Sequence, residues 1–335
     1  MSNVDETVVA HHDCEQWFIQ SIIFPWLFIP RLTPDIVARI VSEDKPAVIP
    51  HHVCSHGKYK YELMPTPKCP VHVLTPRSGS EEVCVFYFHG GAYIRNFESP
   101  AHFDFAINVG ESIGKAATLY LIEYPRAPAY RHDALFDAME EVYRTVLALA
   151  KWDAPGKKVV LMGDSSGGGI ALLLAQRLTR LKKLYASHLK QPDSVILLSP
   201  WLDLGVSAPK EESEALMLKD PILDVAGLRA CGRLLAGGHQ AVELGDSKVS
   251  PLFGNLEGLP PVSVWTGTHD VLHPDSRRLR DRYRQTNWEG PPSRLRYREK
   301  GGLLHCFFLF PGSGTFQTIQ EIGEAIRVNC GLTKT

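Results

Sequence analysis

Residues 159–167 read Val-Val-Leu-Met-Gly-Asp-Ser-Ser-Gly, an apolar run that leads into a serine flanked by two glycines. The run at 159–162 predicts a strand buried on both faces, and the residues that follow Gly167 have a helical pattern. Because Gly163 and Gly167 have no side chains, the turn between this strand and this helix can be tight and strained. Ser165 would then stand at the positive end of the helix dipole, where negative charge is stabilised. A helix N-cap at Ser165 is the simpler alternative.

Short apolar runs of this kind alternate with longer helical patterns along most of the chain. We expect strands at Ala47–Val53, Tyr59–Met64, Val71–Thr75, Val83–Phe88, Ala117–Ile122, Val159–Met162, Val195–Leu198, Val262–Trp265 and Arg294–Arg298. We expect helices at about 101–114, 131–151, 167–184, 275–286 and 315–329. This alternation is typical of a mostly parallel sheet with helices on both faces.

Two parts of the chain do not fit the alternation. Residues 1–46 read as helical and rich in aromatic side chains, and residues of about 205–245 read as a helical insertion. A chain of 335 residues is near the upper limit for one hydrophobic core. We therefore expect a single α/β domain over 1–335, in which 47–204 and 246–335 form the core.

Composition and charge exclude several classes of protein. The 36 Lys and Arg residues balance 37 Asp and Glu residues, so no basic surface for nucleic acid is expected. The seven cysteines include no Cys-x-x-Cys pair, which argues against a disulfide scaffold or a zinc site and favours a reducing compartment. The most apolar stretch, 17–30, contains Pro25 and is shorter than the ~20 residues of a membrane span. Since the N-terminus also lacks a basic region, we expect a cytoplasmic protein without stable membrane insertion.

A second motif follows the predicted strand at 83–88, where residues 89–93 read His-Gly-Gly-Ala-Tyr. The adjacent Gly90 and Gly91 can turn their backbone N–H groups toward a cavity. Donors placed in this way stabilise the oxyanion of the tetrahedral intermediate in ester hydrolysis. On its own, however, the motif fits an ordinary strand-to-loop turn better.

Two further residues complete a set that can perform nucleophilic catalysis. Asp270 follows the predicted strand at 262–265, and His305 lies in a loop after the one at 294–298. A single Asp or His at the end of a strand is usually structural. The order Ser165, Asp270, His305, with each residue after a strand, is nevertheless the order of the catalytic triad in α/β hydrolases.

Together these motifs resemble the hormone-sensitive-lipase-like family of α/β hydrolases, of the microbial carboxylesterase type. The resemblance covers nearly all of residues 80–310. Residues 124–128 read Tyr-Pro-Arg-Ala-Pro and residues 199–203 read Ser-Pro-Trp-Leu-Asp, and both are similar to segments of that family, as are the runs at 220–221, 250–253 and 258–261. The resemblance implies an α/β-hydrolase fold: a mostly parallel central sheet flanked by helices, with a helical cap.

The same resemblance implies catalytic roles. Ser165 would be the nucleophile, His305 the general base and then the general acid, and Asp270 the carboxylate that orients the histidine. An oxyanion hole would be formed by the backbone N–H groups of Gly90, Gly91 and Ser166. Many relatives carry a second acid after the triad aspartate, and Asp275 stands at that place.

A cap over the site is also implied, built by residues 1–46 and about 205–245. We expect the substrate pocket to be lined by Ala92, Tyr93, Trp17, Phe18 and Trp201, with plain packing as an equal alternative for the N-terminal aromatics. Three positions depart from the family. In residues 124–126 the arginine, Arg126, is shifted by one place, so no role is transferred to it. Ala92 replaces the third glycine that commonly follows His-Gly-Gly, and Cys306 follows the histidine where relatives commonly have a small residue.

The resulting hypothesis is a serine carboxylesterase that hydrolyses short- to medium-chain acyl esters through an acyl-enzyme. The triad supplies the chemistry, so we expect no metal ion and no cofactor, and a small-molecule ester as the partner. A homodimer is left open. An amidase, a formamidase or an acyltransferase would use the same triad and remains an alternative. A non-catalytic receptor for a small ligand on this fold is disfavoured by the presence of His305.

Overall fold

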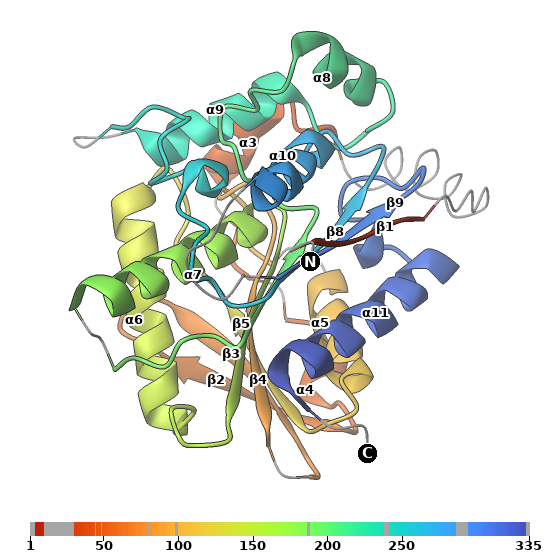
Figure 1. Cartoon of the computed structure of the whole chain (residues 1–335). Coiled ribbons are helices and arrows are strands. Elements are labelled where there is room, and N and C mark those ends of the chain that lie inside the picture. Colours follow the sequence, from red (N-terminus) through yellow and green to blue (C-terminus); the bar gives the residue numbers. More distant parts are fainter. Residues whose placement is uncertain are drawn as a thin grey trace.

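The computed structural model describes residues 4–9, 30–43, 45–47, 49–79, 81–97, 100–185, 188–237, 241–285 and 294–332. Within these ranges, nine strands form one sheet in the order β1-β9-β8-β7-β6-β4-β5-β3-β2, and helices cover both of its faces (Figure 1). Neighbouring strands are parallel, except that β3 pairs antiparallel with β2 and with β5. The mostly parallel α/β architecture expected from the sequence is confirmed.

Most strands lie where the apolar runs predict them. In chain order they are β1 (Val4–Val9), β2 (Tyr59–Pro65), β3 (Pro70–Pro76), β4 (Val83–Phe88), β5 (Ala117–Ile122), β6 (Lys158–Asp164), β7 (Ser194–Leu198), β8 (Val262–Gly267) and β9 (Leu295–Lys300). The predictions for β2 to β9 are confirmed, with bounds that differ by one or two residues. The sequence did not indicate β1.

The helices form two layers on the sheet. They are α3 (Pro34–Glu43), α4 (His51–Cys54), α5 (Ala101–Ser112), α6 (His132–Ala150), α7 (Ser166–Tyr185), α8 (Lys210–Met217), α9 (Val225–Ala236), α10 (His273–Gln285) and α11 (Ser313–Cys330). None of the helices in the described ranges is both long enough and apolar enough to cross a membrane.

The central strand β4 shows why a strand that is covered by helices on both sides needs apolar side chains on both of its faces. Its alternate side chains belong to different cores, because successive side chains of a strand point to opposite faces. Phe86 and Phe88 join the core that includes α6 and α7, whereas Val85 and Tyr87 join the core that includes α5 and α11. All six residues of β4 are therefore buried, which explains the continuous apolar run in the sequence.

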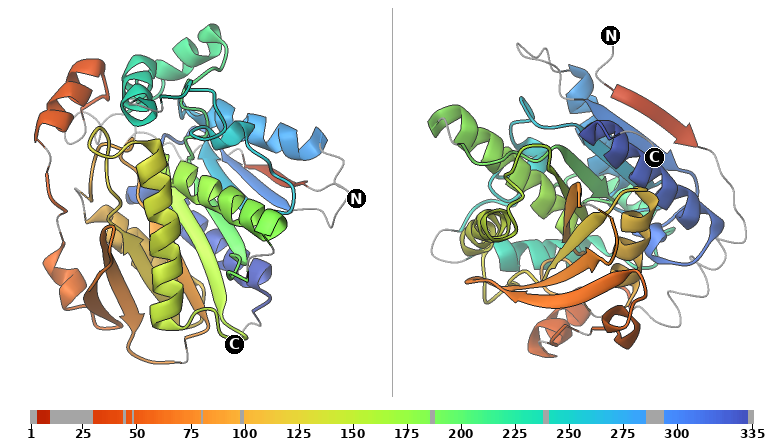
Figure 2. Two further views of the ribbon diagram at one scale, coloured as in Figure 1. Left: turned by 90° about the vertical axis from the view of Figure 1, so that its left-hand side faces the viewer. Right: turned by 90° about the horizontal axis from the view of Figure 1, so that it is seen from below.

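The prediction that the N-terminal segment is helical is wrong at its start. β1 is an edge strand that pairs in parallel with β9, and Figure 2 shows it at the outer edge of the sheet. Its acidic side chains meet arginines near the other end of the chain: Asp5 lies 2.8 Å from Arg298, and Glu6 lies 3.0 Å from Arg280. The strand thus depends on partners that no local pattern reveals.

The strand predicted at Ala47–Val53 is also wrong. Its second half forms the single helical turn α4, which begins after Pro50, whose φ is −64°. The Pro50 carbonyl accepts a hydrogen bond from the Val53 N–H at 3.0 Å. The Val53 side chain is fully buried in the core beside α5. Proline fixes φ near −65° and starts a helix readily, so Val53 is buried by a helical turn rather than by a strand.

Helices α3, α8 and α9 lie together at one end of the molecule (Figure 1). The chain that leads into α3 is hydrogen-bonded to the segment between α8 and α9, through Arg31 Nη2 to the Met217 carbonyl at 2.6 Å and Leu32 N to the Ile222 carbonyl at 2.9 Å. Helix α9 approaches this chain so closely that a Cβ built on Gly227 would lie 1.6 Å from the Leu32 carbonyl oxygen. Only glycine permits this contact.

We expect Gly227→Ala to lower the free energy of unfolding by about 1–3 kcal/mol, because the added methyl group forces α9 away from the Leu32 backbone. The check is urea denaturation followed by circular dichroism. Gly57→Ala is the matched control, since a Cβ at Gly57 meets no atom within 4 Å. Equal stability of the two variants would contradict the close packing.

Candidate active site

Ser165 occupies the strained turn between β6 and α7, with φ of +52°. Its N–H donates to the Leu198 carbonyl on the neighbouring strand at 2.9 Å, which fixes the turn to the sheet. A Cβ on Gly163 would lie 2.2 Å from the Gly167 carbonyl oxygen, and one on Gly167 would lie 1.9 Å from the Phe88 carbonyl oxygen. The two glycines predicted to permit a tight turn are therefore required by backbone contacts on both sides of the serine.

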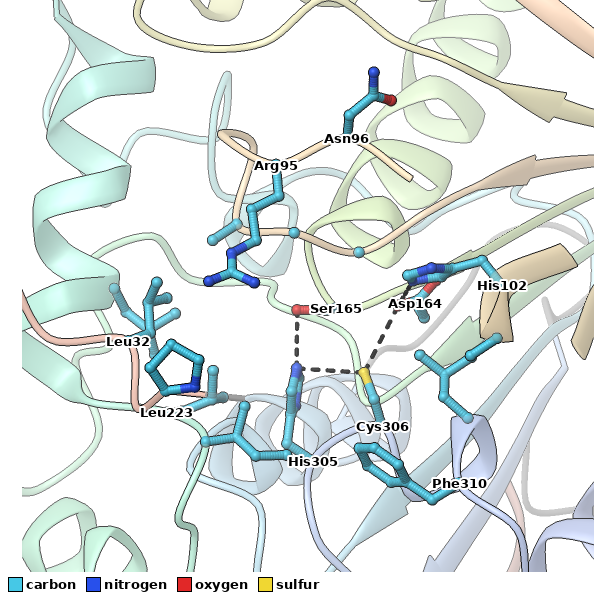
Figure 3. Close-up of a pocket in the computed structure, with 18 residues that line it drawn as sticks. Leu32, Arg95, Asn96, His102, Asp164, Ser165, Leu223, His305, Cys306 and Phe310 are labelled. Atoms are coloured by element: carbon cyan, nitrogen blue, oxygen red, sulfur yellow. Dashed lines mark hydrogen bonds and ion pairs between the residues drawn. The ribbon is translucent and has the colours of Figure 1, made fainter. Parts of the chain in front are cut away.

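Three residues from the ends of different strands form one chain of hydrogen bonds. His305 Nε2 lies 3.0 Å from Ser165 Oγ (Figure 3). On the other side of the ring, His305 Nδ1 lies 3.0 Å from each carboxylate oxygen of Asp270. Since an ionised carboxylate only accepts hydrogen bonds, Nδ1 carries the proton and Nε2 can accept one from the serine. The structure thus brings together the nucleophile, base and orienting acid expected from the sequence.

The acids around His305 stabilise its protonated form. Burial by itself lowers the pKa of His305, but the charge and hydrogen bond of Asp270, with the charges of Asp220 and Asp164, together raise this pKa above its ordinary value of 6.5. Each of these effects acts directly on the imidazolium that forms when the histidine takes a proton.

Asp220 is a buried carboxylate that the sequence did not single out for a role. Its oxygens accept hydrogen bonds from Val271 N at 3.0 Å and from Ile222 N at 2.8 Å. Burial, followed by the charge of Asp270, raises the pKa of Asp220 to about 6. The signal available in the sequence was the Asp-Pro pair at 220–221, which gave no reason to place it beside the triad.

Backbone donors surround the space next to Ser165 Oγ. Gly90 and Gly91 line the same cavity as the serine, and Ser166 is the first residue of α7. Among the described residues, the N–H groups of Gly90, Gly91 and Ser166 donate no hydrogen bond to another backbone or side-chain group. These donors are available to an oxygen atom of a ligand.

His89 holds the turn that carries two of these donors. Its Nδ1 lies 2.6 Å from the Gly90 carbonyl oxygen, and its ring stacks on Tyr124 at a centroid distance of 4.3 Å. Tyr124 in turn donates its O–H to the His89 carbonyl at 2.9 Å. Burial lowers the pKa of His89 to about 3, so this ring is neutral at neutral pH and serves as a fixed hydrogen-bond donor.

A cavity of about 430 Å³ opens onto Ser165 and His305. Its remaining walls are mainly apolar and include Leu32, Leu223, Leu228, Leu309 and Phe310. Leu32 lies just before α3, Leu223 lies between α8 and α9, and Leu228 lies on α9. Segments that are far apart in the sequence therefore line the same cavity.

The predicted pocket residues are only partly found at this cavity. Ala92 lines it. Tyr93 and Trp201 do not, because both are fully buried and pack on each other with a centroid distance of 5.6 Å. The Trp201 indole N–H donates a hydrogen bond to the Asp203 carbonyl oxygen at 2.8 Å. Trp17 and Phe18 lie outside the described residues.

Cys306, which departs from the family pattern, lies directly at the base. Its Sγ is 3.3 Å from His305 Nε2 and 3.7 Å from a carboxylate oxygen of Asp164. Burial, followed by the charges of Asp164 and Asp270, raises the pKa of the Cys306 thiol well above its ordinary value. The group therefore stays a neutral thiol at neutral pH and is a poor nucleophile.

Asp275, expected as the second acid, supports the segment at 199–203 instead of contacting the histidine. Its Oδ2 accepts hydrogen bonds from Leu202 N at 3.2 Å and Asp203 N at 3.0 Å. Burial, followed by the charge of Asp203, raises the pKa of Asp275 to about 8. Within the described ranges, no cluster of three or more His, Cys, Asp or Glu residues is arranged to hold a metal ion.

A large part of the sequence matches a family of known proteins. Residues 85–309, more than half of the chain, match the family model described as the alpha/beta hydrolase fold. The chain belongs to the alpha/beta hydrolase fold family. The mostly parallel sheet and the serine turn at the end of β6 are features of the same fold.

Relatives in this family support the narrower resemblance as well. An esterase of Acinetobacter venetianus is 30% identical over 206 residues, which are 61% of this chain and 62% of that protein. Human hormone-sensitive lipase is 28% identical over 188 residues, which are 55% of this chain and 15% of the lipase. The chain therefore spans about three fifths of the first relative and a small part of the second. The resemblance to the hormone-sensitive-lipase group is confirmed.

Solved structures of alpha/beta hydrolases share the fold closely. The crystal structure of a putative esterase from Staphylococcus aureus superposes with a TM-score of 0.71 at 25% sequence identity. The superposition covers 86% of this chain and 90% of that protein.

We expect Asp270→Asn to lower the pKa of His305, because removal of the carboxylate leaves burial as the larger effect on the imidazole. A titration followed by NMR of the ring carbons measures this pKa in the wild type and the variant. Asp153→Asn, on an exposed loop, is the control and should leave the pKa unchanged. An unchanged or higher pKa in Asp270→Asn would contradict the proposed electrostatics.

Proposed function

We propose that this protein is a serine carboxylesterase that hydrolyses short- to medium-chain acyl esters, with Ser165, His305 and Asp270 as its catalytic triad. The observation that carries the proposal is the unbroken hydrogen-bond chain from Asp270 to Ser165, which ends at a cavity with backbone donors. The name of the Acinetobacter relative, an esterase, supports the same reaction.

In the first half of the reaction, Ser165 Oγ attacks the ester carbonyl carbon while His305 Nε2 takes the serine proton. The proton on Nδ1 is held by Asp270, so the lone pair of Nε2 points at the serine. The bond between the carbonyl carbon and the alcohol oxygen then breaks. His305 returns the proton to that oxygen, the alcohol leaves, and the acyl group stays on Ser165.

The N–H groups of Gly90, Gly91 and Ser166 would bind the negative oxygen of the tetrahedral intermediate. A donor of this kind contributes about 3–4 kcal/mol of transition-state stabilisation. In the second half, water attacks the acyl carbon and gives a proton to His305. The bond between that carbon and Ser165 Oγ then breaks, His305 returns the proton to Oγ, and the acid leaves, so that the free enzyme is restored.

We further propose that α3, α8 and α9 act as the cap of the site, over a core made of 47–204 and 246–335. Leu32 and Leu228, which come from the segments at α3 and α9, close one side of the cavity. A space of about 430 Å³ with leucine walls accommodates a short or medium acyl chain. This is the basis for the proposed chain length.

We expect hydrolysis of 4-nitrophenyl esters to favour acyl chains of two to six carbons and to fall with longer ones. Ser165→Ala should lower kcat by about 10⁴-fold or more, because the nucleophile is lost. Ser55→Ala, on the surface, is the matched control. Hydrolysis that survives in Ser165→Ala would contradict the nucleophile assignment, and a wild type that hydrolyses none of the esters would contradict the esterase proposal.

The pH dependence should follow His305. Catalysis needs this histidine neutral, so kcat/KM falls as the pH falls through its pKa. Because that pKa is raised in the folded protein, the loss should set in above pH 6.5 and be nearly complete by about pH 5. A rate profile that stays flat down to pH 5 would exclude His305 as the base.

A further inference from the structure

A single buried carboxylate, Asp220, joins a wall of the active-site cavity to the loop that carries Asp270. Its Oδ1 accepts hydrogen bonds from Ile222 N at 2.8 Å and from Leu223 N at 3.1 Å. Its Oδ2 accepts a hydrogen bond from the N–H of Val271, the residue after Asp270, at 3.0 Å. Only 1% of Asp220 is exposed, so these three bonds are shielded from solvent.

The first oxygen of Asp220 determines where the cavity wall lies. An aspartate oxygen that accepts from the backbone two and three residues further on closes a tight turn. This turn carries Ile222 and Leu223, which both line the cavity that opens onto Ser165. Figure 3 shows Leu223 on the side of the cavity where Leu32 lies. Since Leu32 N also donates to the Ile222 carbonyl at 2.9 Å, the chain before α3 is attached to the same turn.

The second oxygen of Asp220 reaches the backbone of the triad acid. The loop at 270–272 folds around the carboxylate of Asp270, whose Oδ1 accepts a hydrogen bond from Leu272 N at 2.8 Å. Val271 lies between these two residues, and its N–H donates to Asp220, which is 51 positions away in the sequence. This bond therefore fixes the backbone that holds Asp270 against His305.

The charge of Asp220 also acts on the histidine. Burial lowers the pKa of His305, and the charges of Asp270 and then Asp220 raise it. In turn, burial and then the charge of Asp270 raise the pKa of Asp220 to about 6, whereas the charge of His305 and the N–H groups of Val271 and Ile222 lower it. Asp270 and His305 are thus titratable groups that face Asp220 from the loops packed against it. Removal of the Asp220 charge should lower the pKa of His305.

We propose that Asp220 is a positioning residue that couples the substrate-binding wall to the triad, because it holds Ile222 and Leu223 in a fixed place relative to Asp270. The proposal rests on the esterase function proposed above and concerns the same site. Asp220 acts through Asp270 rather than on the substrate itself. Contacts between a substrate chain and the wall then help to align Asp270 with His305, so that binding energy far from the ester bond speeds the reaction.

The variant Asp220→Asn breaks this link at nearly constant volume. An amide has one oxygen and one NH₂ group, so its oxygen can serve either the donors of the wall or Val271. The NH₂ group then faces an N–H group on the other side. The control is Asp224→Asn, which removes a carboxylate from the same segment. Asp224 caps α9 by accepting from Gly227 N at 3.0 Å, and an asparagine can do the same.

Two pairs of esters compare a short with a long chain at each end of the substrate: 4-nitrophenyl acetate with 4-nitrophenyl hexanoate, and ethyl acetate with hexyl acetate. Rates are expressed per chain that reacts with diethyl 4-nitrophenyl phosphate, so misfolded protein is not counted. In at least one pair, the wild type should have the higher kcat/KM for the longer ester. Asp220→Asn should reduce this preference at least about 5-fold, because the wall is no longer linked to the triad.

The pH profile supplies a second readout that a merely structural role would not change. In Asp220→Asn, the acidic limb of kcat/KM should move to lower pH, because the charge that helps to raise the pKa of His305 is gone. Asp224→Asn should resemble the wild type in both its chain-length preference and its pH profile.

A double-mutant cycle tests the coupling itself. Leu223→Ala shortens the wall and leaves the carboxylate of Asp220 in place, so it should reduce the preference for the longer ester without moving the acidic limb. Its effect on the preference should be smaller in the Asp220→Asn background, because a wall that is not held contributes less. Equal effects in both backgrounds would show that wall and carboxylate act independently, which overturns the proposal.

The proposal is also overturned if the wild type prefers the shorter ester in both pairs, or if Asp220→Asn retains either the chain-length preference or the acidic limb of the wild type. If Asp220→Asn does not fold, NMR of the wild type supplies the test. The amide signals of Ile222, Leu223 and Val271 should shift with pH at one common midpoint, since they share one carboxylate. Separate midpoints, or no shift, would overturn the proposal.

All of these results leave the esterase function standing, because the wild type hydrolyses esters in each case. Failure of the wild type to hydrolyse any of the four esters would overturn the proposed function itself.

Discussion

The whole site depends on the strained turn at Ser165, which is held by backbone contacts with the ends of two neighbouring strands. Gly167 packs directly on the Phe88 carbonyl at the end of β4, and the Ser165 N–H is bonded to Leu198 at the end of β7. Because parallel strands end at the same edge of a sheet, the turn after β4 that carries Gly90 and Gly91 meets the serine after β6. Asp270 and His305, after β8 and β9, reach the serine for the same reason.

The surroundings of the two histidines, His305 and His89, set the protonation state that each one prefers. Three buried acids, Asp270, Asp220 and Asp164, raise the pKa of His305, whereas burial keeps His89 neutral. The first histidine is thus suited to take a proton and the second to hold a turn. Among the described residues, Arg95 also lines the cavity that opens onto Ser165 and His305.

The sequence alone predicts the elements of the fold that depend on a local pattern of apolar residues. Continuous apolar runs located β4 to β8, because strands buried on both faces need apolar side chains at every position. β1 was missed because its partners come from far along the chain: its backbone pairs with β9, and its acidic side chains lie beside Arg298 and Arg280. The candidate triad was predicted from its order along the chain. Asp220 gave no signal of its place near His305, since that place depends on which segments fold together. Tyr93 and Trp201 were misplaced because aromatic character does not distinguish a pocket wall from a core.

The central claim is that Ser165 is the nucleophile activated by His305. Reaction of the wild-type protein with diethyl 4-nitrophenyl phosphate, followed by mass spectrometry of its peptides, tests this claim most directly. An activated serine displaces 4-nitrophenolate and keeps the diethylphosphoryl group. We predict one adduct per chain, on Ser165, and none in the His305→Ala variant. An adduct on another residue, or equal labelling of Ser165 without His305, would contradict the account.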